Sequence, residues 1–484
     1  MVLTFILQAV IVNVMIKTSE NITKRAAKYA VSLEYGDLSV NVIHETKRRL
    51  IDSFACALGA YNSEPGKIAR IIGQKVQSDY YGSTLFGARC KTTPELAAFT
   101  TGILFRYLDY NDTYLSKDPA HPSDNISAAL AVAEAENANG RDLITAIALG
   151  YEIQCRFCDA ASLRARGWDH VGYVSISSAI LSGKLMNMDK QKMEHAIALS
   201  ITPNVALRQT RIGELSMWKG CAAANAARNG VFAAILALGG MTGPCEIFEG
   251  ERGFFNQVTG PFELDTDNFG GKNHGFKIID TYIKYYPSEY HSQAGIEAAL
   301  LLRNKIKTNN IKEINIETYD ACVDIIAGEK EKWNPQTRET ADHSLPYCVA
   351  VALIDGKVGL EQFSEQRIKD PDLQKFLSKI KVERNLEHNK QYPKAFPCLI
   401  EIKSNTGETF SQTVTYPKGH PKNPLSDIEL EEKFMTLNNG LIKNDRVKEI
   451  FDTIWDLENV NNISTIMKLF NLPESRSQNP ESRI

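Results

Sequence analysis

The stretch VNVIHETKRRLIDSFACAL, residues 40–58, decides the class of fold. Its apolar residues recur three and four positions apart, which in a helix of 3.6 residues per turn places them on one face. This spacing continues over residues 19–240, where β-branched alternation is rare. Thr93 and Pro94 form a helix start, and an alanine-rich run over residues 222–238 ends at Gly239 and Gly240. The sequence therefore predicts a large helical domain.

The pattern changes after about Lys277. Short alternating segments predict strands at residues 311–319, 379–383, 398–403 and 410–416, and the last two flank a hairpin loop at 404–407. Beyond Ser426 the spacing is helical again, so these helices can return to the first domain. We expect a mainly α fold in which a smaller α+β lid domain is inserted before the C-terminal helices.

The expected boundaries follow from these changes. The helical domain takes residues 1–278, with 1–18 an uncertain extension, and the lid takes 279–418. Residues 419–472 form the returning part of the helical domain, and the polar segment 473–484 is expected to be a disordered tail. At 484 residues the chain is too long for one ordinary domain.

Charge and composition exclude several classes of function. The formal charge of −3 and the isoelectric point near 6.4 leave no basic field for nucleic acid or an anionic membrane. The first fifteen residues are apolar, but they are too short for a membrane span and lack the flanks of a secretory signal. We therefore expect a cytoplasmic protein that binds a small molecule.

The nine cysteines are scattered through apolar stretches, which is typical of a reducing compartment. Cys155 and Cys158 form a CxxC pair, but this pair lies inside a helical pattern and no second pair accompanies it. We interpret both as buried thiols rather than as zinc ligands. No metal and no cofactor is expected.

The first polar cluster joins residues 106–113 to His121. Asp109, Asp112 and Thr113 share one face if the preceding helix persists, and the turn at residues 119–122 can bring His121 beside them. An acid/base site and ordinary helix-cap chemistry both fit these residue types. A metal site built from Asp109, Asp112 and His121 has no recognisable ligand spacing.

Other clusters add histidines and cations. His170 stands at a helix entrance, and Lys219 stands at the start of the alanine-rich helix with Arg208 upstream. A lysine in an apolar helix start either snorkels to the surface or faces an anionic ligand. We expect Lys219 to be needed for chemistry and dispensable for stability. Lys284 and His291 lie at the predicted domain junction, where ligand sites are common.

Taken in order, these clusters resemble the MmgE/PrpD family over roughly residues 21–470. The segments that carry the resemblance are RYLDYNDTY (106–114), HPSDN (121–125), GWDH (167–170), WKG (218–220), IKYYPSEYHSQ (283–293), ETADHSLPY (339–347) and YPKGHPKNP (416–424). The resemblance implies a helical domain with an inserted α+β lid, a homodimer, and catalysis without an iron–sulfur cluster.

The resemblance also implies a set of site residues between the two domains. The catalytic candidates are His121, His170, Asp109, Lys219, Lys284 and Tyr347. The candidates for substrate binding are Thr113, Asp112, His291 and Arg208, with Asp342 close by.

The resemblance favours cofactor-independent dehydration of a tricarboxylate, 2-methylcitrate, to 2-methyl-cis-aconitate. Within the family, decarboxylation of cis-aconitate and epimerisation of iminodisuccinate are alternatives. A non-enzymatic helical interaction protein is an alternative of another class. Convergence of the lysines and histidines in one cleft separates the enzyme from the interaction protein.

Overall fold

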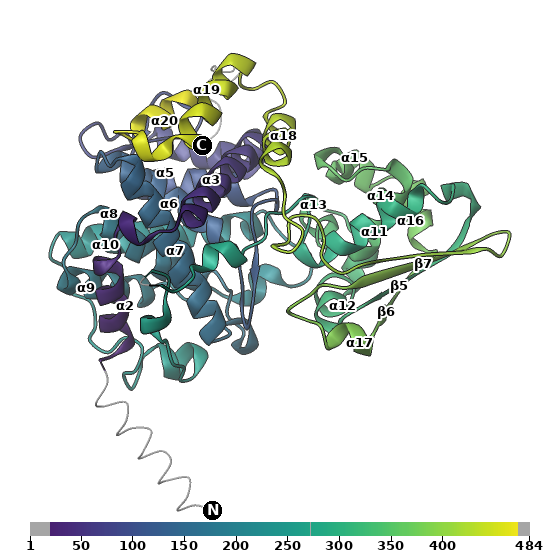
Figure 1. Cartoon of the computed structure of the whole chain (residues 1–484), viewed down its shortest axis with the longest axis horizontal. Coiled ribbons are helices and arrows are strands. Elements are labelled where there is room, and N and C mark those ends of the chain that lie inside the picture. The colour runs from purple at the N-terminus through teal and green to yellow at the C-terminus, as the bar shows by residue number, and fades with distance from the viewer. Residues whose placement is uncertain (1–19, 272, 473–484) are drawn as a thin grey trace, which may run out of the picture.

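The computed structural model describes residues 20–271 and 273–472, which form a helical lobe and a smaller α+β lobe side by side (Figure 1). The extension expected at residues 1–18 and the tail expected at 473–484 lie outside the described residues. Each lobe has a hydrophobic core of its own. The fold is mainly α, as predicted.

The helical lobe contains most of the long helices. Its first part comprises α2 (Ile22–Ser32), α3 (Val40–Ala60), α4 (Glu64–Gln74), α5 (Pro94–Arg106), α6 (Ile126–Ala135), α7 (Gly140–Ala160), α8 (Gly172–Leu185), α9 (Lys190–Ile201) and α10 (Trp218–Leu238). Two short hairpins interrupt them, made of β1 (Ser83–Thr84) with β2 (Lys91–Thr92) and of β3 (Tyr114–Leu115) with β4 (Pro119–Ala120).

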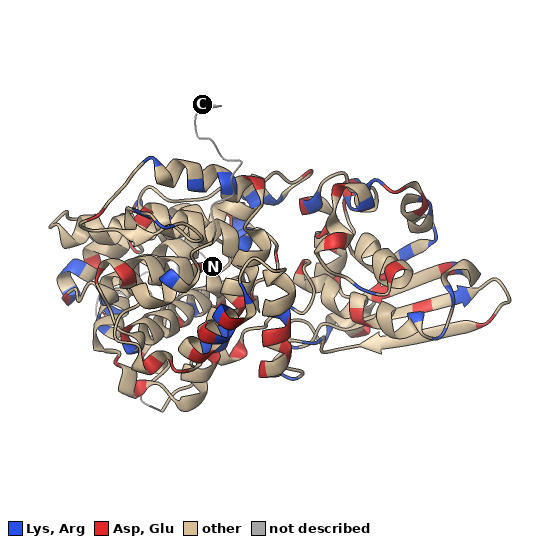
Figure 2. Cartoon of the chain, turned by 90° about the horizontal axis from the view of Figure 1, so that it is seen from above, with Lys and Arg blue, Asp and Glu red and all other residues tan. Residues whose placement is uncertain are grey.

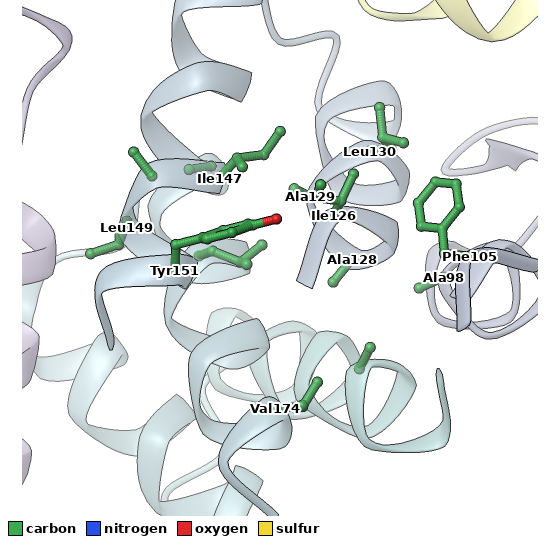
Figure 3. Packing of buried hydrophobic residues seen from close by; sticks show 14 of the residues in the cluster. Ala98, Phe105, Ile126, Ala128, Ala129, Leu130, Ile147, Leu149, Tyr151 and Val174 are labelled. Atoms are coloured by element: carbon green, nitrogen blue, oxygen red, sulfur yellow. The ribbon is translucent and has the colours of Figure 1, made fainter. Parts of the chain in front are cut away.

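Small residues let α10 pack closely against α5, α8 and α9. A Cβ at Gly230 would lie 2.6 Å from the Ser175 carbonyl oxygen of α8, and one at Gly102 would lie 2.9 Å from the Ala224 Cβ of α10. Figure 3 shows similar packing nearby, where Ala98, Ala128 and Ala129 lie among larger side chains such as Phe105 and Tyr151. By length and composition α10 is the one described helix that could cross a bilayer, but most of it is buried, as in a core helix.

The α+β lobe is built on one four-stranded sheet. Its strands are β5 (Ile311–Thr318), β6 (Ile380–Arg384), β7 (Cys398–Ser404) and β8 (Thr409–Val414), in the order β6-β5-β7-β8. The β5–β6 pair is parallel and the other pairs are antiparallel. The helices are α11 (Gln293–Arg303), α12 (Asp320–Ile326), α13 (Arg338–Ala341), α14 (Leu345–Asp355), α15 (Glu365–Ile368), α16 (Pro371–Leu377) and α17 (Leu386–Asn389).

The C-terminal helices α18 (Asp427–Asn438), α19 (Asn444–Trp455) and α20 (Ser464–Leu469) lie on the helical lobe (Figure 1). Leu430 and Phe434 of α18 belong to the core of that lobe. Lys433 Nζ lies 2.6 Å from Asp52 Oδ1 of α3 and donates to the carbonyl oxygens of Tyr110 and Lys284. Helix α18 therefore fastens the segment that leads into the α+β lobe.

The connection between the lobes is also held by a backbone bridge. The Thr113 amide donates to the Tyr282 carbonyl at 2.9 Å, and the Tyr282 amide donates back at 2.8 Å. Acidic and basic residues are interspersed over both lobes in Figure 2. A strong local electric field must therefore come from charged side chains that gather at the junction between the two lobes.

Candidate active site

The chain leaves the helical geometry just after α5. Helix α5 ends at Arg106, and Asp109 adopts a left-handed conformation with φ of 52°. Such a conformation is uncommon for a residue with a side chain and is tolerated best by Asn and Asp. Asp109, Asp112 and Thr113 therefore do not share one helical face, and each side chain contacts different partners.

Asp109 is the centre of a buried ionic network. Lys284 Nζ lies 3.0 Å from Asp109 Oδ1 and donates to the Asp109 carbonyl at 2.9 Å, while Lys219 Nζ lies 3.4 Å from Oδ2. Arg106 pairs with the same carboxylate. Burial opposes ionisation, but Arg106, Lys219 and Lys284 outweigh it and hold the pKa of Asp109 well below its ordinary value.

The network continues into the α+β lobe. Lys219 Nζ lies 3.3 Å from Asp342 Oδ1, which also receives His343 Nδ1 at 2.6 Å. Burial and the positive charge of Lys219 lower the pKa of His343. The carboxylates of Asp109 and Asp342 therefore connect both lobes through one lysine.

The network is a poor place for a metal ion. Atoms of Asp109, Asp342 and His343 lie within 4.8 Å of one another, but the ammonium groups of Lys219 and Lys284 already neutralise the carboxylates. The other ligand set considered from the sequence does not converge, because the Asp112 carboxylate is committed elsewhere: Oδ2 accepts from Tyr151 Oη at 2.6 Å and Oδ1 from the Ser123 amide at 3.0 Å.

His121 is held by the loop that follows β4. Its Nδ1 lies 2.7 Å from the Asp112 carbonyl oxygen and 3.2 Å from Thr113 Oγ1. A carbonyl only accepts, so Nδ1 carries the proton and the lone pair of neutral His121 is on Nε2. Burial and the nearby Arg106 lower the pKa of His121 well below its ordinary value. This geometry suits a general base.

His170 faces His121 from the entrance of α8. The two ring centroids are 5.8 Å apart. His170 Nδ1 lies 2.9 Å from Asp169 Oδ1, and Arg211 Nε holds the same carboxylate at 3.0 Å. Burial opposes ionisation of Asp169, but Arg211 and His170 outweigh it and lower its pKa. In the described part of the chain His170 Nε2 has no hydrogen-bond partner.

Both imidazoles line a cavity of about 520 Å³ between the lobes. Its wall also carries six cationic side chains, which are Arg106, Lys117, Arg164, Arg208, Arg211 and Lys332. The two carboxylates in the wall are Asp109, already paired with cations, and Glu289. The cavity therefore attracts a compact polyanion.

The structure brings half of the sequence-predicted site residues to the cavity wall. Those in the wall are Asp109, His121, His170, Arg208 and His291. Lys219 and Lys284 are fully buried and contact Asp109 from outside the wall. Asp112 and Thr113 support His121.

Tyr347 lies elsewhere. Its hydroxyl donates to the Gln362 carbonyl at 2.5 Å, its ring packs against Phe363, and it belongs to the core of the α+β lobe. Tyr347 follows the N-cap Ser344 on the inner face of α14, which turns the side chain into the lid. Tyr347 therefore has no role in the proposed reaction.

Several cavity residues were not assigned a role from the sequence. Arg164 and His343 line the cavity, and Asp169 lies behind it against His170. The segments GWDH and ETADHSLPY, which contain or adjoin these residues, were the available indication in the sequence. Lys332 had no such indication, because it lies in an ordinary charged turn of the α+β lobe. Only the fold brings it opposite the arginines.

Fold and cavity define an enzyme with two lobes and a histidine pair between them. Residues 24–267 match the MmgE/PrpD N-terminal domain and residues 286–457 match the MmgE/PrpD C-terminal domain. The chain belongs to the MmgE/PrpD family.

Named relatives are dehydratases and a decarboxylase. The chain is 26% identical to a 2-methylcitrate dehydratase of Escherichia coli (strain K12), over 82% of this chain and 86% of the relative. It is 26% identical to a mitochondrial 2-methylcitrate dehydratase of Yarrowia lipolytica, over 78% and 77%. It is also 26% identical to the cis-aconitate decarboxylase of Homo sapiens, over 95% and 97%. These names support an enzyme.

Proposed function

We propose that the chain is a hydro-lyase that removes water from 2-methylcitrate to form 2-methyl-cis-aconitate. The observation that carries this proposal is the pair His121 and His170, each anchored through Nδ1, with Nε2 left for substrate in a cationic cavity. Dehydration needs one group that removes a proton and one that protonates the leaving hydroxide. The dehydratase relatives support the choice of substrate.

His121 is the proposed base. The proton to be removed is on a carbon that bears a carboxylate, so electron density moves into a group that is already negative. Cations prearranged around that carboxylate lower the barrier, because they stabilise charge that develops in the transition state. Arg211 is suited to this role, since its Nη2 is buried without a partner in the described chain and its side chain lines the cavity.

His170 is the proposed acid. Asp169 accepts from Nδ1 and fixes the ring, so that Nε2 faces the cavity and can donate a proton to the departing hydroxyl. The carbon–hydrogen electrons form the new double bond as the carbon–oxygen bond breaks, and hydroxide leaves as water. His121 removes one proton and His170 supplies one, so the step is balanced in protons.

Decarboxylation of cis-aconitate is the second candidate. The human decarboxylase aligns with 95% of this chain, which is more than the named dehydratases cover. The same imidazoles and cations would then stabilise the carbanion left by loss of CO₂, and one imidazolium would protonate it. Lid residues that face the substrate would decide between the two reactions.

To test this proposal, purified protein is incubated in separate reactions with 2-methylcitrate, citrate, cis-aconitate and iminodisuccinate. Ultraviolet absorbance follows the conjugated product, and CO₂ release is measured in parallel. The dehydratase proposal expects a new chromophore from 2-methylcitrate without CO₂. Release of CO₂ from cis-aconitate, without dehydration of 2-methylcitrate, would reject the dehydratase proposal in favour of a decarboxylase.

A further inference from the structure

Two arginines of the cavity wall have no counter-ion in the described part of the chain. Arg164 lies in the turn Arg164–Arg166 before His170, and Arg208 begins the turn Arg208–Arg211 before α10. Both side chains line the cavity. Among the described residues, neither guanidinium lies within 4.0 Å of a carboxylate or makes a hydrogen bond. We therefore expect a bound ligand to supply the anionic partner of both guanidinium groups.

The two turns are joined, so the arginines stay close. The Arg208 amide donates to the Gly167 carbonyl at 3.2 Å, and Trp168 and Leu207 form an isolated antiparallel bridge. Burial and the positive charge of Arg164 lower the pKa of Arg208. Two guanidinium groups held together without an anion repel each other, and a bound carboxylate would remove that cost.

The neighbouring acids Asp169 and Asp118 make their hydrogen bonds to other groups, and Asp118 Oδ2 has no hydrogen-bond partner among the described residues. Asp169 accepts from His170 and Arg211. Asp118 Oδ1 accepts from Ser162 Oγ at 3.0 Å and from the Arg164 amide at 3.1 Å. These carboxylates position the turns and leave both guanidinium groups unpaired.

A third cation enters from the α+β lobe. Lys332 is 2% exposed and lines the same cavity, and its ion contact among the described residues is with Glu329 Oε2 at 3.7 Å. Ser344 Oγ donates to its carbonyl oxygen and fixes the turn. Glu289 is the other acid in this part of the wall, and its Oε2 accepts from the His291 amide at 2.7 Å. Cations thus face the cavity from both lobes.

We propose that Arg164, Arg208 and Lys332 form a separate carboxylate subsite, which binds a substrate carboxylate that takes no part in bond breaking. This inference rests on the proposed function and extends it, because the subsite selects tricarboxylates over dicarboxylates. The histidine pair and Arg211 serve the reacting carbons, and Arg164, Arg208 and Lys332 hold the distal end.

A non-reactive ligand tests the subsite without requiring turnover. Tricarballylate carries three carboxylates and no hydroxyl, and its dissociation constant is measured by titration calorimetry. Arg164→Gln, Arg208→Gln and Lys332→Gln should each weaken binding about tenfold or more, the usual effect of losing a charge-assisted hydrogen bond. Arg166→Gln and Lys330→Gln are matched controls, because both residues are exposed and outside the cavity wall, and they should bind as the wild type does.

A kinetic measurement separates substrate binding from a structural role. With 2-methylcitrate, the three cavity variants should raise KM more than they lower kcat, and their melting temperatures should match the wild type. Wild-type affinity for tricarballylate in Arg164→Gln and Arg208→Gln, or no tricarballylate binding by the wild type, would overturn the subsite. Binding that depends on the arginines without turnover of 2-methylcitrate would uphold the subsite and reject the proposed function.

Discussion

His121 and His170 have different hydrogen-bond partners, and this difference supports the roles proposed for them. His121 Nδ1 meets a neutral carbonyl, whereas His170 Nδ1 meets the carboxylate of Asp169. Burial and the nearby Arg106 lower the pKa of His121, which suits a base, whereas the Asp169 carboxylate orients His170 with its Nε2 toward the cavity, where an acid is needed. The sequence identified both histidines but left the assignment open, because it depends on these partners.

Replacing either histidine should abolish most turnover. We expect His121→Asn and His170→Asn to lower kcat by a factor of about 100 or more, as is usual for a proton-transfer group. Their melting temperatures should change little, because asparagine can still donate toward the Nδ1 partner. His274→Asn, at an exposed position, is the control. Unchanged kcat in both variants, measured on folded protein, would remove the pair from the mechanism.

The protonation of His121 is open to direct measurement. Because burial and Arg106 lower its folded pKa below 6.5, the unfolded chain binds the proton more readily. The contribution of His121 to stability is therefore present above pH 6.5 and is lost as the pH falls through the folded value. Chemical shifts of labelled histidine side chains, assigned with His121→Asn, should show a neutral ring at pH 6. A midpoint at or above 6.5 would contradict this.

At the scale of elements, the hydrophobic periodicity of the sequence predicted many of the helices and strands. The alanine-rich run became α10, Thr93 and Pro94 stand at the start of α5, and the four predicted strands are confirmed to within a few residues as β5 to β8. The end of α5 at Arg106 and the left-handed conformation of Asp109 were not predicted. The Asp109 carboxylate pairs with Arg106 nearby in the chain, but also with Lys219 and Lys284, and these two contacts between distant segments cannot be read from the local sequence.

The ionic network where α5, α10 and α13 meet should be a stability element. Lys219 is fully buried between Asp109 and Asp342, so the expectation that it is dispensable for stability needs revision. Asp109→Asn leaves Lys219, Lys284 and Arg106 without their shared carboxylate. We expect a loss of about 3–5 kcal/mol in the free energy of unfolding, measured by urea titration.

A double variant tests the origin of that loss. Adding Lys219→Met to Asp109→Asn should recover part of the stability, because one uncompensated charge is removed. Asp79→Asn, at an exposed position, should stay within about 0.5 kcal/mol of the wild type. Asp109→Asn as stable as the wild type would mean that the network contributes no net stability.

At the scale of the whole molecule, exposed apolar residues on α4 and at the start of α10 form the surface that we propose for the homodimer implied by the resemblance. Helix α4 exposes Ile68, Ile71 and Ile72, and the start of α10 exposes Met217 and Trp218. Ala69 of α4, Ile103 of α5 and Cys221 of α10 pack together beneath them. Exposed apolar patches of this kind commonly mark association surfaces.

We propose that a second copy of the chain covers this patch. Light scattering after size exclusion at micromolar concentration should give twice the chain mass of 53.9 kDa. Trp218→Glu should shift the protein toward the monomer, since a charge would be buried in the interface. Leu386→Glu, at a residue 77% exposed on the α+β lobe, should leave the dimer intact. A monomeric wild type would contradict the proposal.

We propose that the two lobes enclose a hydro-lyase site whose chemistry depends on a pair of imidazoles. The most direct measurement is the rate at which 2-methyl-cis-aconitate appears from 2-methylcitrate, with purified wild type and with the double variant His121→Asn, His170→Asn, in the presence of a chelator. We expect steady product formation by the wild type and almost none by the variant. No product from the wild type, or equal rates from both proteins, would contradict it.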